Sequence, residues 1–127
     1  MPRLNGYTKN QVIGIYEKMV TSRKLDDKML VMLKQGKSFF HIGASGHEAA
    51  QLAVAVLIRP GKDWSYPYYR DGAYCLGIGM TAREQLLSFL AKADDPNSGG
   101  RQMPQHYGHK DLNIVSQSSP TGTQFLQ

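Results

Sequence analysis

The chain has 127 residues, of which 41% are apolar and 20% are charged, values that fit one ordinary globular domain and exclude a disordered or fibrous protein. No apolar run approaches the roughly 20 residues that span a bilayer, and residues 1–6 lack the apolar core of a signal peptide, so we expect no membrane partner. A single cysteine, Cys75, excludes an internal disulfide and favours a cytoplasmic location.

The net charge of +5 raises the possibility of a nucleic-acid partner. Residues 1–38 hold eight Lys and Arg against three Asp and Glu, whereas residues 39–127 hold seven of each. The whole excess therefore lies along one expected helix, and a solvated helix face explains it. We expect no nucleic-acid partner, although an acidic partner surface remains an alternative.

The first expected element is a long helix over about residues 8–35. Thr8 and Gln11 are spaced as a capping box, apolar residues recur every three or four positions, and Gly36 is suited to the turn that ends a helix. Such a helix would be roughly 40 Å long. This length predicts that residues 1–37 form an N-terminal helical arm that packs along something larger.

A second helix is expected over residues 49–58, after an apolar connector at residues 38–44. Ser45 and Glu48 are spaced as another capping box, which explains Glu48 better than a role as a catalytic acid. The helix is apolar nearly all round, so the pattern predicts that it is buried.

Residues 64–72 crowd four aromatic rings, a guanidinium and a carboxylate into one short stretch. Pro67 excludes a helix interior, so we expect a stiff extended segment that presents Tyr69 and Arg70. An Arg side chain offers a planar fork of donors suited to phosphate or carboxylate oxygens. The alternative is a buried aromatic strand in which Arg70 only pairs with Asp71.

The remaining pattern predicts short elements joined by loops. Residues 73–80 favour a short helix, and a third capping box at residues 81–84 opens a helix that continues through Leu90. Residues 94–100 are typical of a turn and residues 100–110 of an ordered loop. A strand is expected over residues 112–115, followed by hydroxyl-rich residues 116–124, which suit an anion or a monovalent cation.

Two kinds of site compete for the polar residues of these loops. His106 and His109 have a metal-ligand spacing, but zinc would need further ligands such as His41 or His47, and the lone thiol of Cys75 is typical of a small buried residue. A better-supported interpretation combines the residues that follow apolar elements, namely Tyr69, Arg70, His106, Ser118 and Ser119. This set suits a di- or polyphosphate cofactor together with a carboxylate substrate.

Three segments carry a family resemblance: residues 63–72, residues 100–108 with their Gly-Arg-Gln-Met-Pro run, and residues 118–120. They resemble the α subunit of the thiamine-diphosphate-dependent 2-oxo acid dehydrogenases, in particular the branched-chain (2-oxoisovalerate) type. The resemblance implies an α/β fold in which this chain is the N-terminal part of a thiamine-diphosphate-binding domain, mostly helical with one or two parallel strands. It also implies that residues 1–127 form a single incomplete domain, with the arm at 1–37 and the start of the cofactor-binding domain at 38–127.

The resemblance also implies roles for single residues. It assigns Tyr69 and Arg70 to the diphosphate and His106 to the reaction chamber as a catalytic residue. Substrate contacts would come from Phe40, Tyr69, Ser119 and His106. Ser119 and Thr121 would contact the cofactor, although Thr121 replaces the bulky aliphatic residue usual in the family. A potassium-binding loop would comprise Ser118, Pro120, Thr123 and Gln124.

The activity implied by the resemblance is oxidative decarboxylation of a branched-chain 2-oxo acid, with transfer of the acyl group to the lipoyl arm of an acyltransferase partner. The family works as two α and two β chains, so a β subunit or a fused β domain is the second implied partner. Magnesium ligands of the family follow the stretch corresponding to this sequence, so we expect no activity from residues 1–127 alone. The alternative is a non-catalytic helical module that docks on a β-type subunit.

Overall fold

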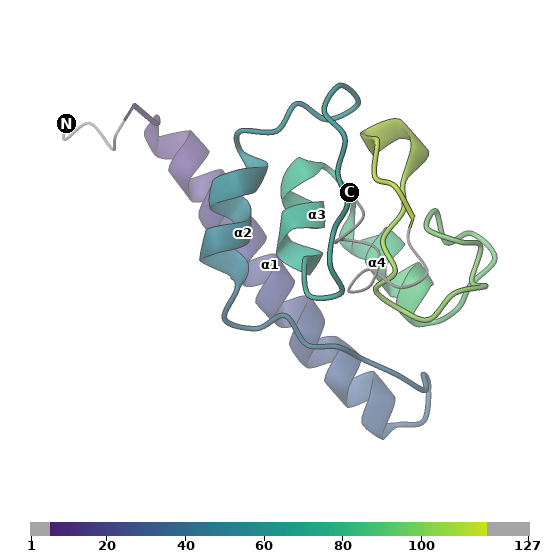
Figure 1. Ribbon diagram of the computed structural model, residues 1–127. Helices are drawn as coiled ribbons and strands as arrows, with labels where there is room; N and C mark the ends of the chain where they lie inside the picture. Colours follow the sequence, from purple (N-terminus) through teal and green to yellow (C-terminus); the bar gives the residue numbers. More distant parts are fainter. Residues whose placement is uncertain (1–5, 117–127) are drawn as a thin grey trace.

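The computed structural model describes residues 6–116, which form an assembly of helices. The long helix α1 (Lys9–Lys34) runs along one side of the molecule, and α2 (Glu48–Ala55), α3 (Gly72–Ile78) and α4 (Ala82–Phe89) lie beside it (Figure 1). A 3₁₀ turn, η1 (Lys110–Leu112), follows. Within the described residues no helix combines the length and apolarity needed to cross a membrane.

The predicted first helix is confirmed, and so is its capping box. The Thr8 hydroxyl accepts a hydrogen bond from the Gln11 backbone N–H at 3.3 Å, while the Gln11 side chain accepts from the Thr8 N–H at 2.8 Å. Gly36 adopts a φ of 70° just after the helix, a conformation that glycine takes without strain. The helix packs against α2, α3 and α4 along its length.

The second predicted capping box is wrong. The Ser45 hydroxyl donates to Asp26 Oδ2 at 2.7 Å, so it is not available to the first turn of α2. Glu48 begins the helix and forms an ion pair with Arg23, at 2.7 Å between Oε1 and Nε. The hydrogen bond from Arg23 is the main cause that lowers the pKa of Glu48. Arg23 of α1 therefore holds the first turn of α2, and no local sequence pattern signals this ion pair.

The expectation that the second helix is buried all round is also wrong. Helix α2 ends at Ala55, and only its inner side, with Leu52 and Ala55, lies in the core. On the outer side Val54 is 52% exposed and Leu57, just beyond the helix, is 74% exposed. No segment within residues 6–116 covers that side of α2.

The core consists of two clusters, and α1 contributes side chains to both of them. The larger cluster joins α2 and α3 with Tyr107 and Ile114, and the smaller one joins Leu25 and Met29 of α1 to Phe89 of α4. Helices α2 and α3 approach closely at Gly77, where an added Cβ would lie 2.3 Å from the Cβ of Ala55. Glycine is therefore required at that contact.

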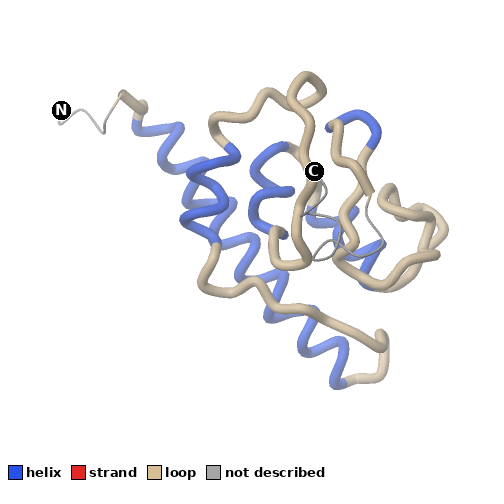
Figure 2. The backbone as a smooth tube through the Cα atoms, in the orientation of Figure 1, coloured by secondary structure: helices blue, strands red, loops and turns tan. Residues whose placement is uncertain are grey.

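The predicted short helix after residue 72 and the capping box of Thr81 are confirmed as α3 and α4. The predicted strand over residues 112–115 is wrong within the described residues, since η1 and a left-handed Asn113 (φ 52°) occupy its first half. Only isolated bridges remain, a parallel one between Ser65 and Ile114 and an antiparallel one between His109 and Ile114. The described part is thus mostly helical, with loops between the helices and no parallel strands (Figure 2).

Candidate functional site

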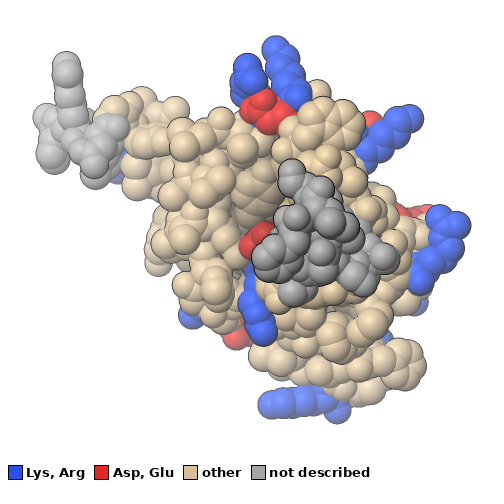
Figure 3. All heavy atoms as spheres, viewed as in Figure 1, with Lys and Arg blue, Asp and Glu red and all other residues tan. Residues whose placement is uncertain are grey.

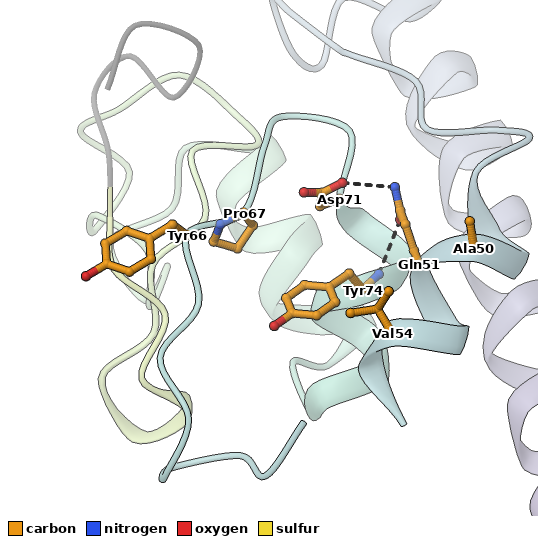
Figure 4. Close-up of a pocket in the computed structure, with 7 residues that line it drawn as sticks. All are labelled: Ala50, Gln51, Val54, Tyr66, Pro67, Asp71 and Tyr74. Carbon is orange, nitrogen blue, oxygen red and sulfur yellow. Dashed lines mark hydrogen bonds between the residues drawn. The ribbon is translucent and has the colours of Figure 1, made fainter. Parts of the chain in front are cut away.

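The segment that carries Tyr69 and Arg70 is a loop that ends in a turn at residues 69–71 and is anchored at both ends. At its start, the Ser65 N–H donates to the Asn113 carbonyl at 3.0 Å. At its end, Gln51 of α2 reaches across and donates to the Arg70 carbonyl at 2.8 Å and to Asp71 Oδ1 at 3.1 Å (Figure 4). Pro67 lies outside any helix, as predicted, but Tyr69 and Arg70 lie in a turn rather than in an extended segment. The hydrogen bonds from Gln51 fix the point where α3 begins.

Asp71 does not serve as a counter-ion for Arg70. Its carboxylate accepts from the Tyr68 N–H at 2.7 Å and from Gln51, and no ion pair with Arg70 occurs among the described residues. Burial raises the pKa of Asp71, and the Tyr68 N–H offsets this only in part. The interpretation that Arg70 merely pairs with its neighbour is wrong.

The guanidinium of Arg70 instead reaches the connector between α1 and α2. Its Nη1 donates to the Gly43 carbonyl at 2.6 Å, and the residue is exposed. A guanidinium has several N–H donors in a planar fork, so one hydrogen bond to a carbonyl orients it without neutralising its charge. Arg70 is thus an oriented cation at the surface.

His106 lies against this segment. Its ring packs edge-on against the ring of Tyr69, with centroids 5.0 Å apart and planes at 68°. His106 Nδ1 lies 2.9 Å from the Met103 carbonyl, which can only accept, so Nδ1 carries the proton. The residue is only 7% exposed. The structure therefore brings Tyr69 and His106 into contact from two loops that are far apart in the sequence, with Arg70 next to Tyr69 in the chain.

Phe40 lies in the connector after α1, beside residues 101–104 of the loop that bears His106. It lines a hollow of about 430 Å³ together with Phe89, Leu90, Met103 and Pro104, and the basic residues Lys37 and Arg101 also line it. The hollow has mostly apolar walls with cationic groups beside them. It begins next to the loop that bears His106.

The other predicted site residues, Ser118, Ser119, Pro120, Thr121, Thr123 and Gln124, lie outside the described residues. The competing metal hypothesis finds no support within residues 6–116, where no cluster of ligands could hold an ion. His109 Nε2 instead lies 3.4 Å from Glu84 Oε1. Cys75 is buried as expected, and burial raises the pKa of its thiol well above the usual range.

The sequence interpretation missed three residues that support the site: Asp26, His41 and Gln105. They form a buried polar chain from α1 to the loop before His106, with 2.9 Å between Asp26 Oδ1 and His41 Nε2 and 3.1 Å between His41 Nδ1 and Gln105 Nε2. One signal was present in the sequence. Asp26 falls between Leu25 and Met29 on the apolar side of α1, and a carboxylate at such a position needs buried partners.

Two further hollows lie away from this cluster. One, of about 360 Å³, is formed between α2 and the aromatic segment by Ala50, Gln51, Val54, Tyr66, Pro67, Asp71 and Tyr74 (Figure 4). The other, of about 420 Å³, runs between the N-terminal half of α1 and α2 and includes Ile15, Lys18 and Leu52. The Lys18 ammonium donates to the Gly77 carbonyl at 2.8 Å across this second hollow.

The family described as dehydrogenase E1 component matches residues 16–127 of the chain. The chain belongs to this family. It is 44% identical over 119 residues to the 2-oxoisovalerate dehydrogenase subunit alpha of Bacillus subtilis, a match that covers 94% of this chain and 36% of that protein.

More distant relatives agree with this E1 assignment. The chain is 34% identical over 115 residues to the mitochondrial 2-oxoisovalerate dehydrogenase subunit alpha 1 of Arabidopsis thaliana, covering 91% of this chain and 24% of that one. It is 30% identical over 122 residues to the human mitochondrial subunit alpha, covering 94% and 26%. The chain thus spans about a quarter to a third of the length of these relatives.

Proposed function

We propose that this chain contributes one wall of the cofactor site in the α subunit of a branched-chain 2-oxo acid dehydrogenase, an oxidoreductase that decarboxylates 2-oxo acids and passes the acyl group to a lipoyl group. The observation that carries the proposal is the contact between the Tyr69 and His106 rings, beside Arg70, whose guanidinium is oriented by the Gly43 carbonyl. The proposal is further supported by relatives that bear the name 2-oxoisovalerate dehydrogenase subunit alpha.

The described residues fit the diphosphate of thiamine diphosphate. A diphosphate needs fixed positive charge and hydrogen-bond donors, which Arg70 supplies with its oriented guanidinium and Tyr69 with its hydroxyl. No described cluster could hold a divalent ion, so we place the magnesium ligands of the proposed site on other residues. Potassium would be held by Ser118, Pro120, Thr123 and Gln124, and Ser119 and Thr121 would contact the cofactor.

Thiamine diphosphate, when bound, supplies the carbon nucleophile that adds to the 2-oxo group and lets carbon dioxide leave. The chain's own residues would hold and orient the reactants. Arg70 would anchor the phosphate charge. His106, whose Nδ1 donates to the Met103 carbonyl, presents Nε2 as the basic nitrogen, and it would take up or deliver a proton there.

The substrate contacts would come from Phe40, Tyr69, Ser119 and His106. The mostly apolar hollow beside Phe40 suits an aliphatic side chain better than a charged one. Lys37 and Arg101, which line the same hollow, would favour an acidic substrate. Together these features support a branched-chain 2-oxo acid.

The proposed partners are a β subunit or fused β domain, in an assembly of two α and two β chains, and a lipoyl acyltransferase. We retain the division into an arm at residues 1–37 and the start of the cofactor-binding domain at residues 38–127. A cytoplasmic location is proposed on the single cysteine, which is buried and unpaired by any disulfide.

A second candidate function is a helical module that docks on a β-type subunit without catalysis. It is favoured by the exposed apolar side chains of Val54, on α2, and Leu57, just beyond the helix. Space-filling views show little charge over α2 on the face that is visible (Figure 3). Such surfaces mark interaction sites in many proteins.

The test substitutes Arg70 in the protein as expressed from its native gene, with the subunits that co-purify. Because a charge-assisted hydrogen bond contributes about 1.5–3 kcal/mol, Arg70→Gln should weaken thiamine diphosphate binding by about 10- to 100-fold in calorimetric titration. The matched control is Arg83→Gln, an exposed arginine whose nearest carboxylate, Asp94, lies 3.9 Å away.

Equal cofactor affinity in the Arg70 and Arg83 variants would contradict the proposed diphosphate contact. The docking module predicts a different result. In that case the wild-type protein binds a β-type subunit but neither thiamine diphosphate nor 2-oxo acid, and releases no carbon dioxide.

A further inference from the structure

A carboxylate of α1 holds the connector that follows the helix. Asp26 is only 7% exposed, and its Oδ2 accepts from the backbone N–H groups of Ala44 and Ser45, each at 2.9 Å, and from the Ser45 hydroxyl at 2.7 Å. The connector passes so close that a Cβ added at Gly43 would lie 3.3 Å from the same oxygen. Asp26 of α1 therefore fixes the position of Gly43 through its hydrogen bonds to the next two residues.

The second oxygen of Asp26 faces His41, whose side chain is almost fully buried. His41 Nε2 lies 2.9 Å from Asp26 Oδ1, and the ring edge packs against Phe89 of α4, with ring centroids 5.9 Å apart. On the other side of the ring, Nδ1 lies 3.1 Å from Gln105 Nε2. An amide nitrogen can only donate, so Nδ1 accepts and Nε2 carries the proton.

Gln105 closes the chain of contacts by clamping the connector. Its Oε1 accepts from the Ile42 N–H and its Nε2 donates to the Ile42 carbonyl, both at 2.6 Å. Its backbone has a φ of 68°, a left-handed conformation that is costly for a residue other than glycine. The side-chain contacts with Ile42 and His41 offset that cost.

Both ends of this chain of contacts touch the candidate site. Gly43, next to the clamped Ile42 and Ala44, offers the carbonyl that orients Arg70 at 2.6 Å. Gln105 directly precedes His106, whose ring packs against Tyr69. A buried carboxylate, imidazole and carboxamide are costly to place in an interior. Here they connect α1 to the connector, whose Gly43 carbonyl bonds to Arg70, and to the loop that supplies His106.

We propose that Asp26, His41 and Gln105 are positioning residues that set the orientation of the Arg70 guanidinium and the His106 imidazole for cofactor binding. The proposal rests on the function proposed above, since it assigns these residues to the same site. They act through the connector and the loop, and they need not touch the cofactor. Their removal should therefore weaken cofactor binding while the helices stay folded.

The experiment uses the natively expressed protein and compares Asp26→Asn and Gln105→Met with the control Asp27→Asn. Asp27 is the next residue of α1 and is exposed. Because supporting residues outside a site typically change its affinity by 10- to 100-fold, we expect about a tenfold weaker Kd for thiamine diphosphate in both test variants. The control should keep the wild-type Kd. Circular dichroism checks that helical content is retained.

A double-mutant cycle separates positioning from general loosening. If Asp26 acts through Gly43 and Arg70, Asp26→Asn should weaken binding much less in an Arg70→Gln background than in the wild type. A merely structural role would give the same fold loss in both backgrounds. Gln105→Met should also lower kcat at saturating cofactor, because His106 is the next residue.

Each outcome decides a separate point. Wild-type protein that does not bind thiamine diphosphate would overturn the proposed function and this inference together. Wild-type binding with equal Kd values in Asp26→Asn, Gln105→Met and Asp27→Asn would overturn the positioning role alone. Should Asp26→Asn lose its helical content, the Kd of Gln105→Met decides, since that change lies in a loop and keeps the side-chain volume.

Discussion

The polar groups beneath the connector (Asp26, His41 and Gln105) and the outer side of α2 differ in the partners that their side chains have within the described residues. On the connector side, Asp26 and Gln105 are buried, and their polar atoms bond to Ser45, to His41 or to the connector backbone. On the outer side of α2, apolar groups face outward: Val54 is 52% exposed and Leu57, just beyond the helix, is 74% exposed. The geometry of the connector is thus set within the described residues, whereas exposed apolar groups like those beside α2 mark interaction surfaces in many proteins.

The largest expected effect is the loss of the Asp26 carboxylate. Asp26→Ala leaves two backbone N–H groups and His41 without their acceptor, and breaking a buried charged cluster in this way costs about 3–5 kcal/mol. Urea unfolding of the natively expressed protein measures this cost. Asp27→Ala serves as the control, and equal midpoints for the two variants would show that the connector is held by other contacts.

The same carboxylate predicts how stability depends on acid. Burial raises the pKa of Asp26, but hydrogen bonds from His41, Ser45 and Ala44 outweigh this and hold it below its ordinary value of 3.8. The folded pKa is thus depressed, so the contribution of Asp26 is complete above pH 3.8 and is lost as the pH falls through the folded pKa. Unfolding curves between pH 5 and pH 2 should fall less steeply in Asp26→Asn than in the wild type. An unchanged slope would mean that the carboxylate gains nothing from its partners.

An intermediate effect is expected where α2 packs on α3. Gly77→Ala places a methyl group 2.3 Å from the Cβ of Ala55, and such overpacking costs about 1–3 kcal/mol. Gly14→Ala is a matched helical control, because an added Cβ there meets nothing within 4 Å. It should stabilise α1 by about 0.5–1 kcal/mol. Thermal unfolding that changes in the same direction for both variants would contradict the close packing.

The smallest effect on folding is expected on the outer side. Leu57→Ser should change the free energy of unfolding by no more than about 0.5 kcal/mol, because the exposed side chain makes few contacts within the described residues. The same change should reduce co-purification of the proposed β partner. Leu52→Ser, on the buried side of α2, is the contrasting control and should destabilise strongly. A large loss of stability from Leu57→Ser would show that this side is covered within the protein.

Sequence patterns predicted the elements whose signals are local. Thr8 and Thr81 bond within their own helices, so a spacing of three residues was sufficient to find both caps. Pro67 likewise acts on its neighbours and predicted that residues 64–70 form no helix. Ser45 shows the same local spacing but bonds to Asp26, 19 residues away. A stronger partner from a distant part of the chain displaced the local one.

The sequence predicted which residues belong to the candidate site, but not the buried residues that hold them in place. Tyr69, Arg70 and His106 were predicted as site residues from their placement after apolar elements, and the family resemblance implied their roles. Their proximity could not be derived from spacing, since His106 lies 36 positions after Arg70. The strand expected at residues 112–115 depended on an apolar run alone, and Asn113 in a left-handed conformation interrupts it. Asp26, His41 and Gln105 carry no motif, because their roles arise from contacts between three separate segments.

A crystal structure of the natively expressed protein with thiamine diphosphate bound tests the central claim most directly. We predict diphosphate oxygens within hydrogen-bond distance of the Arg70 guanidinium and the Tyr69 hydroxyl, with the His106 ring still against Tyr69 and the Gly43 carbonyl still bonded to Arg70. A diphosphate bound elsewhere, with Arg70 facing only solvent and the Gly43 carbonyl, would contradict the account.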